Sequence, residues 1–66
     1  MKILIKVERA KLDITQQELA DAIKVSRQTI NSIEAGRYTP STVLSLKIAK
    51  FFNVTVNDLF ELDEDD

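Results

Sequence analysis

The segment from Thr15 to Gly36 constrains the fold most, because it has the pattern of two short helices joined by a tight turn. Thr15 stands before an apolar-periodic run, and Glu18 follows three residues later. At this spacing a hydroxyl and a returning carboxylate satisfy the free backbone donors of a helix start. The pattern predicts a helix over about 16–24, with apolar positions at Leu19, Ala20, Ala22 and Ile23.

A second helix is predicted over about 27–35. Ser26 offers an N-cap oxygen ahead of it, and Ile30 and Ile33 place two apolar side chains on one face. Gly36 is the residue best able to adopt the left-handed backbone that ends a helix. The two isoleucines are therefore expected to anchor this helix in the core.

The opposite face of the second helix is polar but carries neither lysine nor glutamate. Arginine pairs well with guanine in the major groove of DNA, and glutamine or asparagine with adenine. The residue types therefore suit direct base recognition, with Arg27 and Gln28 as the main candidates. The supporting candidates are Thr29, Asn31 and Ser32. The alternative is a polar face that only contacts solvent, with Ser26 serving only as a cap.

Two stretches carry a resemblance to a known family: TQQELADAIKVSRQTINSIEAGRYTPS and LKIAKFFNVTVNDLF. They resemble the helix-turn-helix and the closing helices of the Cro and phage-repressor-like transcriptional regulators, the xenobiotic-response-element family. The match runs from about Ile5 to Phe60. The features found in register are Ala20 between the helices, Val25, Ile30, Ile33, Glu34 and the Gly-x-x-x-Pro-Ser step.

The resemblance implies a DNA-binding domain over residues 1–60 whose second predicted helix, the recognition helix, enters the major groove. It also implies contacts to the DNA backbone, which set register without reading sequence. The residues at those positions are Gln16, Gln17, Ser26, Arg37, Tyr38 and Ser41. For Tyr38 the alternative is a side chain that covers the core edge with its hydroxyl in water.

Two further expectations come from the resemblance. Arg9 and Glu34 match an ion pair that joins the first helix to the recognition helix in relatives; the alternative is two surface charges. Lys24 stands where the family usually has glycine and a left-handed backbone, so a turn strained by roughly 1–2 kcal/mol is expected there.

The ends of the chain complete an all-α, five-helix fold of the lambda-repressor-like type. The first segment, Met1–Leu12, has both strand and helix periodicity, and we expect a helix from about Leu4 after one or two extended residues. Those residues are expected to form a very short antiparallel pair with Glu61 and Leu62. Ser41 is expected to cap a helix over 42–52, and Asn53 fits the left-handed residue that ends it. This helix is apolar beyond one stripe, including Val43 and Leu46, with only Ser45, Lys47 and Lys50 clearly polar, so we expect it to be nearly central. A last helix follows Thr55 and ends near Phe60.

Apolar residues near the end of the chain exceed what a small core is expected to absorb. We interpret the surplus as a two-fold homodimer surface; a monomer whose tail folds back is the alternative. The residues concerned are Phe51, Val54, Val56, Leu59, Phe60 and Leu62.

Composition narrows the function. The 66 residues include no cysteine and no histidine, which removes thiolate chemistry, a neutral-pH general base and the usual zinc ligands. We therefore expect no enzyme, no metal and no cofactor. No apolar run approaches a membrane span and no cleavable leader is visible, so a cytoplasmic protein is expected.

The net charge of −2 divides unevenly along the chain. Five of the eleven acidic residues lie in the tail 61–66, so residues 1–60 carry nine basic and six acidic groups, a net charge of +3. The tail is interpreted as a solvated, disordered end. A basic body is compatible with double-stranded DNA as the partner.

These observations favour a sequence-specific transcriptional regulator, most simply a repressor that binds a near-palindromic operator as a homodimer. One alternative is an antitoxin that also regulates its own synthesis. Another is an interaction module that binds a second regulatory protein through the apolar end of the chain.

Overall fold

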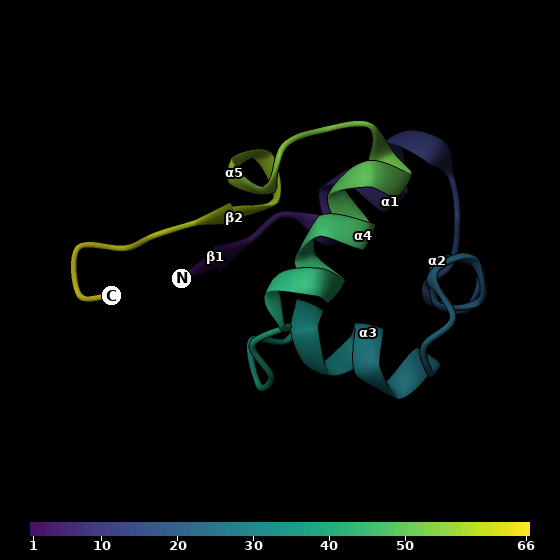
Figure 1. Ribbon diagram of the computed structural model, residues 1–66, viewed down its shortest axis with the longest axis horizontal. Helices are drawn as coiled ribbons and strands as arrows, with labels where there is room; N and C mark the ends of the chain where they lie inside the picture. The colour runs from purple at the N-terminus through teal and green to yellow at the C-terminus, as the bar shows by residue number, and fades with distance from the viewer.

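Five helices and one pair of two-residue strands make up the computed structural model, which describes all 66 residues (Figure 1). None of the helices is long and apolar enough to cross a membrane. The elements are β1 (Lys2–Ile3), α1 (Ile5–Leu12), α2 (Gln16–Ile23), α3 (Arg27–Glu34), α4 (Thr42–Phe52), α5 (Val56–Leu59) and β2 (Phe60–Glu61). The predicted number of helices is confirmed.

Side-chain caps begin four of the five helices, as the sequence predicts. Thr15 accepts a hydrogen bond from the Glu18 amide at 3.0 Å, and the Glu18 carboxylate accepts one from the Thr15 amide at 3.0 Å. This capping box starts α2. Thr55 and Asp58 form a second capping box at α5, whereas Ser26 and Ser41 cap α3 and α4 through the serine oxygen alone.

Left-handed residues lie at the C-terminal ends of four of the five helices. Lys24 (φ 61°) and Asn53 (φ 57°) close α2 and α4 as expected, and Gly36 (φ 76°) follows α3. Asp13 (φ 55°) ends α1 in the same conformation, which the sequence analysis did not predict. Helices α2 and α3 each end one residue earlier than expected, at Ile23 and Glu34, because the next residue forms the cap.

The two strands join the ends of the chain. Lys2 pairs with Glu61 and Ile3 with Phe60 in antiparallel register, so the pair is shifted by one residue from the expected partners Glu61 and Leu62. The reason is that the Leu4 amide donates to the carbonyl of Leu59, the last residue of α5, at 2.8 Å. Pairing therefore begins at once at Phe60.

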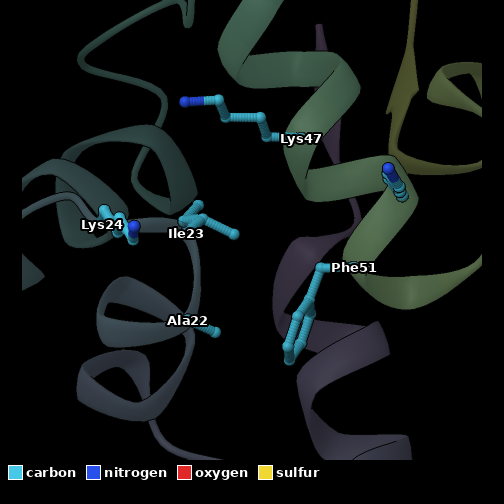
Figure 2. A pocket seen from close by; sticks show the side chains of 6 residues that line it. Ala22, Ile23, Lys24, Lys47 and Phe51 are labelled. Carbon is cyan, nitrogen blue, oxygen red and sulfur yellow. The ribbon is translucent and has the colours of Figure 1, made fainter.

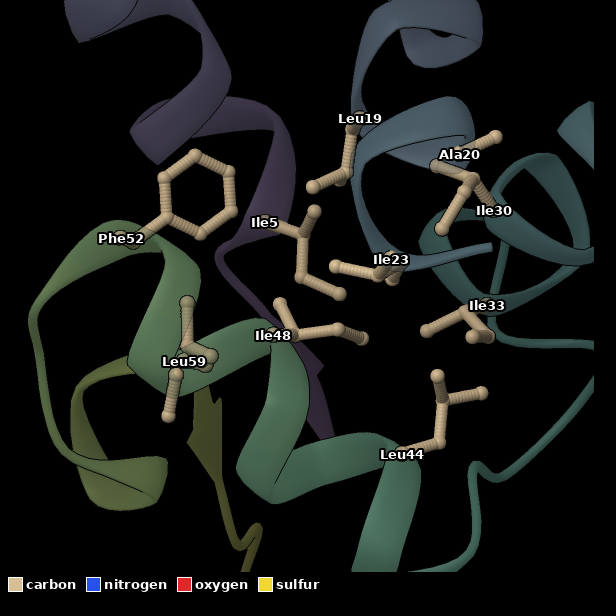
Figure 3. Packing of buried hydrophobic residues seen from close by; sticks show 11 residues of the cluster. Ile5, Leu19, Ala20, Ile23, Ile30, Ile33, Leu44, Ile48, Phe52 and Leu59 are labelled. Carbon is tan, nitrogen blue, oxygen red and sulfur yellow. The ribbon is translucent and has the colours of Figure 1, made fainter. Parts of the chain in front are cut away.

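One apolar core lies among all five helices (Figure 3). Ile30 and Ile33 of α3 are fully buried, and Figure 3 shows Ala20 of α2 beside Ile30 where these two helices pack. A small residue at this contact lets the two helices approach closely. The remaining core residues are Ile5, Leu19, Ile23, Leu44, Ile48, Ala49, Phe52 and Leu59.

Helix α4 is less fully buried than its composition indicates. Val43 and Leu46 were expected to be covered, but they remain 63% and 56% exposed. Ser45, expected to be polar and wet, is partly buried and donates its hydroxyl to the Ser41 carbonyl at 2.9 Å. One face of α4 therefore packs in the core, and the opposite face meets solvent.

The predicted dimer surface also needs correction. Leu59 is completely buried within one chain and is not available to a partner. Val54, Val56 and Phe60 are partly buried against the same core. Of the six predicted residues, only Phe51 and Leu62 are exposed, and Leu62 is 79% exposed. The monomer therefore absorbs most of the apolar surplus because α5 and β2 fold back onto it.

The acidic tail is exposed but makes defined contacts. The N-terminal ammonium of Met1 lies 2.8 Å from carboxylate oxygens of both Asp63 and Asp66. The Asp66 amide donates to the Asp63 carbonyl, which folds residues 63–66 into a turn. The tail therefore differs from the expected disordered end.

The left-handed conformation of Lys24 leads to a stability prediction. Lys24→Gly removes the steric cost of a side chain at positive φ, and the greater freedom of glycine in the unfolded chain offsets part of this gain. The free energy of unfolding should stay unchanged or rise by up to ~1 kcal/mol, measured by urea denaturation. Lys24→Ala, which keeps the strain and loses the ammonium, is the control. A clear loss in both variants would mean that the ammonium itself stabilises the fold.

Candidate nucleic-acid interface

Helix α3 presents one polar face to solvent because its apolar residues point inward. Ile30 and Ile33 lie in the core, and α3 lies at the lower edge of the molecule in Figure 1, away from the paired strands. Arg27, Gln28 and Asn31 are exposed on the outer side, and Ser32 is partly exposed. The packing of two isoleucines thus orients the predicted base-contacting face outward.

Two shallow hollows flank this face. The first is lined by Arg27, Gln28, Asn31, Ser32 and Arg37, and the second by Ser26, Gln28, Thr29, Ser32 and Tyr38. Gln28 and Ser32 line both hollows and form the ridge between them. No acidic side chain lines either hollow, while two arginines line the first. The surface therefore offers hydrogen-bond donors and positive charge to an anionic partner.

Arg27, Gln28 and Ser32 are the side chains of this face that have no hydrogen-bond partner in the chain. The side-chain hydrogen bonds of α3 and its N-cap involve Ser26, Thr29, Asn31 and Glu34. Arg27 and Gln28 carry the larger sets of unpaired donors and acceptors. Their donors and acceptors are free to meet a base edge without first breaking an internal bond. This arrangement agrees with their selection as the main base-contact candidates.

The turn after α3 returns the chain along its outer face. Gly36 adopts φ 76°, and the Arg37 amide donates to the Ser32 carbonyl at 2.9 Å. The Arg37 guanidinium then donates to the Asn31 amide oxygen at 2.8 Å. The Asn31 side-chain oxygen is therefore already bound by Arg37, and one acceptor lone pair remains for a base edge.

A bridge of side chains connects this face to the interior. Asn31 donates to the Gln16 side-chain oxygen at 3.4 Å, and Gln16 donates to Glu34 at 3.1 Å. Gln16 begins α2, whereas Asn31 and Glu34 belong to α3. The first predicted DNA-backbone contact thus also joins the two helices of the motif.

The bridge ends at the predicted ion pair. Arg9 donates to both Glu34 carboxylate oxygens, at 2.7 and 3.0 Å, and a third donor of Arg9 reaches the Ile14 carbonyl at 2.9 Å. Only 13% of the Arg9 side chain and 7% of the Glu34 side chain are exposed. The alternative of two separate surface charges is therefore wrong, and the pair joins α1, the α1–α2 connection and α3.

The ion pair shifts the pKa values of both partners. Burial by itself would raise the pKa of Glu34. Hydrogen bonds from Arg9 and Gln16, together with the positive charges of Arg9 and Lys6, lower the pKa below its ordinary value. The hydrogen bonds to Glu34 raise the pKa of Arg9. The carboxylate consequently stays ionised, and the pair remains charged at neutral pH.

The other residues predicted to contact the DNA backbone differ from one another in exposure and in hydrogen-bond partners. Tyr38 is exposed and lines the second hollow, so it does not simply cover the core. Ser26 accepts from the Thr29 amide and shares a hydrogen bond with the Thr29 hydroxyl at 2.9 Å, which occupies both groups at the helix start. Gln17 bonds to Asp21, and neither Gln17 nor Ser41 lines a hollow.

Sequence reasoning did not predict the bonds that connect Arg37, Asn31, Gln16 and Glu34. No local signal marks them, because the partners are separated by 6, 15 and 18 residues. They form only once the Gly36 turn and the packing of α2 on α3 bring these side chains together. Three residues predicted to act separately on DNA therefore belong to one connected group.

Comparison with known proteins agrees with this geometry. The helix-turn-helix family pattern matches residues 5–59. An HTH-type transcriptional regulator of Methanocaldococcus jannaschii is 48% identical over 66 residues, which cover all of both chains. One from Archaeoglobus fulgidus is 46% identical, covering all of this chain and 93% of its own. YgzD, an HTH-type regulator of Bacillus subtilis, is 42% identical and covers 98% of each chain.

The fold and the site define a DNA-binding helix-turn-helix domain. The chain belongs to the helix-turn-helix family of the Cro and phage-repressor type, and its five helices have the lambda-repressor-like arrangement. It is a transcriptional regulator whose partner is DNA.

The lowered pKa of Glu34 predicts an effect of pH on stability. A carboxylate with a folded-state pKa below its unfolded value of about 4.3 stabilises the protein above that pH, and this contribution is lost as pH falls. Glu34→Gln should therefore be less stable at neutral pH and should lose less stability between about pH 5 and 3. Urea denaturation across this range measures both effects.

The matched control is Glu61→Gln, which removes an exposed carboxylate that makes no ion pair. Asp58 and Asp66 also have lowered pKa values, the first from the Thr55 amide and the second from the N-terminal ammonium, and both remain in every variant. Identical acid profiles for the Glu34→Gln variant and the wild type would contradict the proposed role of the pair.

Proposed function

We propose that this protein is a sequence-specific repressor that binds a near-palindromic operator as a homodimer, with α3 of each copy in the major groove. The proposal goes beyond family membership, which establishes a DNA-binding regulator. A bound dimer would act by covering DNA that polymerase or an activator needs.

The observation that carries the proposal is the free pair Arg27 and Gln28 on an outward face without acidic groups. Arginine recognises guanine through two hydrogen bonds to its major-groove edge, and glutamine recognises adenine similarly. The two residues are neighbours on the first turn of α3, which is where recognition helices of this motif approach the bases. Thr29, Asn31 and Ser32 support them, and Asn31 does so while held by Arg37.

Contacts to the DNA backbone are assigned to residues around the rim. Arg37 and Tyr38 each line one of the two hollows, and Gln16 contacts both Asn31 and Glu34. Gln17, Ser26 and Ser41 are weaker candidates because Gln17 bonds only to Asp21 within α2, and the hydroxyls of Ser26 and Ser41 cap helices. These contacts would fix the position of α3 without selecting bases.

Two-fold symmetry then sets the shape of the operator. A dimer would place its two α3 helices about one DNA turn apart, roughly 34 Å, in successive major grooves. An inverted repeat with half-site centres about 10 base pairs apart follows from this spacing.

Selection of random duplex DNA on the purified protein, sequenced at two salt concentrations, tests the proposal. Enrichment of an inverted repeat with that spacing is the expected result. Salt-sensitive retention with no shared sequence would overturn sequence-specific binding and favour a protein partner, as in an antitoxin or an interaction module.

Single substitutions separate base recognition from backbone contact. Arg27→Ala should weaken binding to the selected sequence by ~1–3 kcal/mol and relax the preference at one base position. Arg37→Ala should weaken binding to selected and random duplexes alike, and lower the salt dependence by about one unit of slope. Binding titrations at several salt concentrations measure both. Equal losses on the two duplexes for Arg27→Ala would refute its assignment.

A further inference from the structure

A groove on the side of the molecule between α2 and α4 has an apolar wall and a basic rim (Figure 2). Ala22, Ile23 and Phe51 supply the wall, and Figure 2 shows the Phe51 ring and Ile23 facing the space between the helices. Phe51 packs edge-on against the buried Phe52, with ring centres 5.0 Å apart. The wall is therefore held in place by the core.

Three lysines complete the groove: Lys24, Lys47 and Lys50. The ion pairs of the chain involve Met1, Arg9 and Lys11, so none of these three lysines has an acidic partner. Figure 2 shows Lys47 extending from α4 toward the turn after α2. An apolar wall beside three uncompensated positive charges fits a short segment that carries an apolar side chain and carboxylates.

The chain itself contains such a segment. Leu62 is the most exposed large apolar residue, and four acidic residues follow it. The bonds from Met1 to Asp63 and Asp66 fold these residues into a turn, with Glu64 and Asp65 at its tip. These two carboxylates have no ion-pair partner in the chain. The segment 62–66 is therefore complementary in charge to the groove and already folded.

We infer that the Leu62–Asp66 segment of one copy docks into the Ala22–Phe51 groove of a second copy, with Leu62 against the apolar wall and Glu64 and Asp65 beside the lysines. This inference rests on the proposed function, because it names the surface that holds the operator-binding dimer together. It also uses Phe51 and Leu62, the two predicted interface residues that the monomer leaves exposed.

Geometry favours a second copy over the chain's own tail. The strand pair holds the start of the tail at the end of the molecule where both termini lie, and the tail then runs away from α2 (Figure 1). Five residues span at most ~17 Å, whereas the molecule is 32 Å long. A two-fold arrangement lets each tail reach the other copy, and it closes after two subunits.

Exposed ion pairs contribute little individually, so burial of Leu62 would supply the attraction and the charges would supply specificity and salt dependence. Each contact occurs twice in a symmetric dimer, so one substitution changes two sites. Reversing the charge of the groove should therefore weaken dimerisation at least ten-fold.

Sedimentation equilibrium of the full chain, over a range of protein and salt concentrations, tests the inference. Wild type should form a dimer that weakens with salt. The groove variant Lys47→Glu/Lys50→Glu and the tail variant Glu64→Lys/Asp65→Lys should both be monomers. Lys6→Glu/Lys11→Glu, which makes the same charge change on α1, should dimerise like wild type. Thermal unfolding by circular dichroism checks that every variant is folded.

A mixture of the groove variant and the tail variant gives the sharpest result. The acidic tail of the first then meets the lysines of the second, and the basic tail of the second meets the new glutamates. Both contacts are restored, so the mixture should form a heterodimer although neither variant associates alone.

Three outcomes would overturn the inference: a wild-type chain that stays monomeric, a groove variant that still dimerises, or a mixture that stays monomeric. If the groove variant keeps the mass of the wild-type dimer but binds DNA with a lower salt dependence, the lysines contact phosphates instead. Failure of the proposed function looks different, because it removes the enriched DNA sequence. An enriched sequence with unchanged masses would overturn only the docking of the tail.

Discussion

The ion pair between Arg9 and Glu34 is the contact on which the orientation of the recognition helix depends. Apolar packing positions α3 through Ile30 and Ile33, but aliphatic contacts tolerate some rotation and sliding, whereas a bidentate pair specifies direction. Arg9 also bonds to the Ile14 carbonyl, and Glu34 also accepts from Gln16. The Glu34 carboxylate, at the end of α3, therefore contacts both the last turn of α1 and the start of α2. A buried pair of this kind contributes orientation more than net stability, because desolvation offsets much of its attraction.

The same carboxylate links the interior to the surface that is proposed to contact DNA. Gln16 passes the connection from Glu34 to Asn31, and Asn31 is held in turn by Arg37. The position of Arg37 depends on backbone geometry, because the left-handed Gly36 turns the chain back along α3. A β-carbon at Gly36 would meet no atom within 4 Å, so the requirement for glycine is one of backbone conformation alone. Arg27, Gln28 and Ser32 remain without internal partners beside these bonded side chains.

Local chemistry made much of this fold predictable from sequence. Thr15, Ser26 and Ser41 began helices where cap spacing indicated, and α4 has the predicted bounds Thr42–Phe52. Contacts between distant residues were harder, because one sequence carries no direct record of them. Leu59 was assigned to a dimer surface because the return of α5 onto the core could not be judged from apolar content. The exposure of Val43 and Leu46 was not predicted for the same reason, because apolar content does not show which face of α4 packs in the core. The base-contact residues remain a prediction, supported by their exposure and lack of internal partners.

The central claim is that the outer face of α3, framed by residues bonded to the interior, recognises DNA. Amide chemical shifts of the isotope-labelled protein, titrated with a duplex carrying its selected sequence, test this claim most directly. We expect the largest changes at Arg27–Ser32, at Arg37 and Tyr38, and at the starts of α2 and α4. We also expect a random duplex to shift the backbone-contacting residues but to leave Arg27 and Gln28 less changed. Large changes confined to the paired strands or the acidic tail, with α3 unaffected, would contradict it.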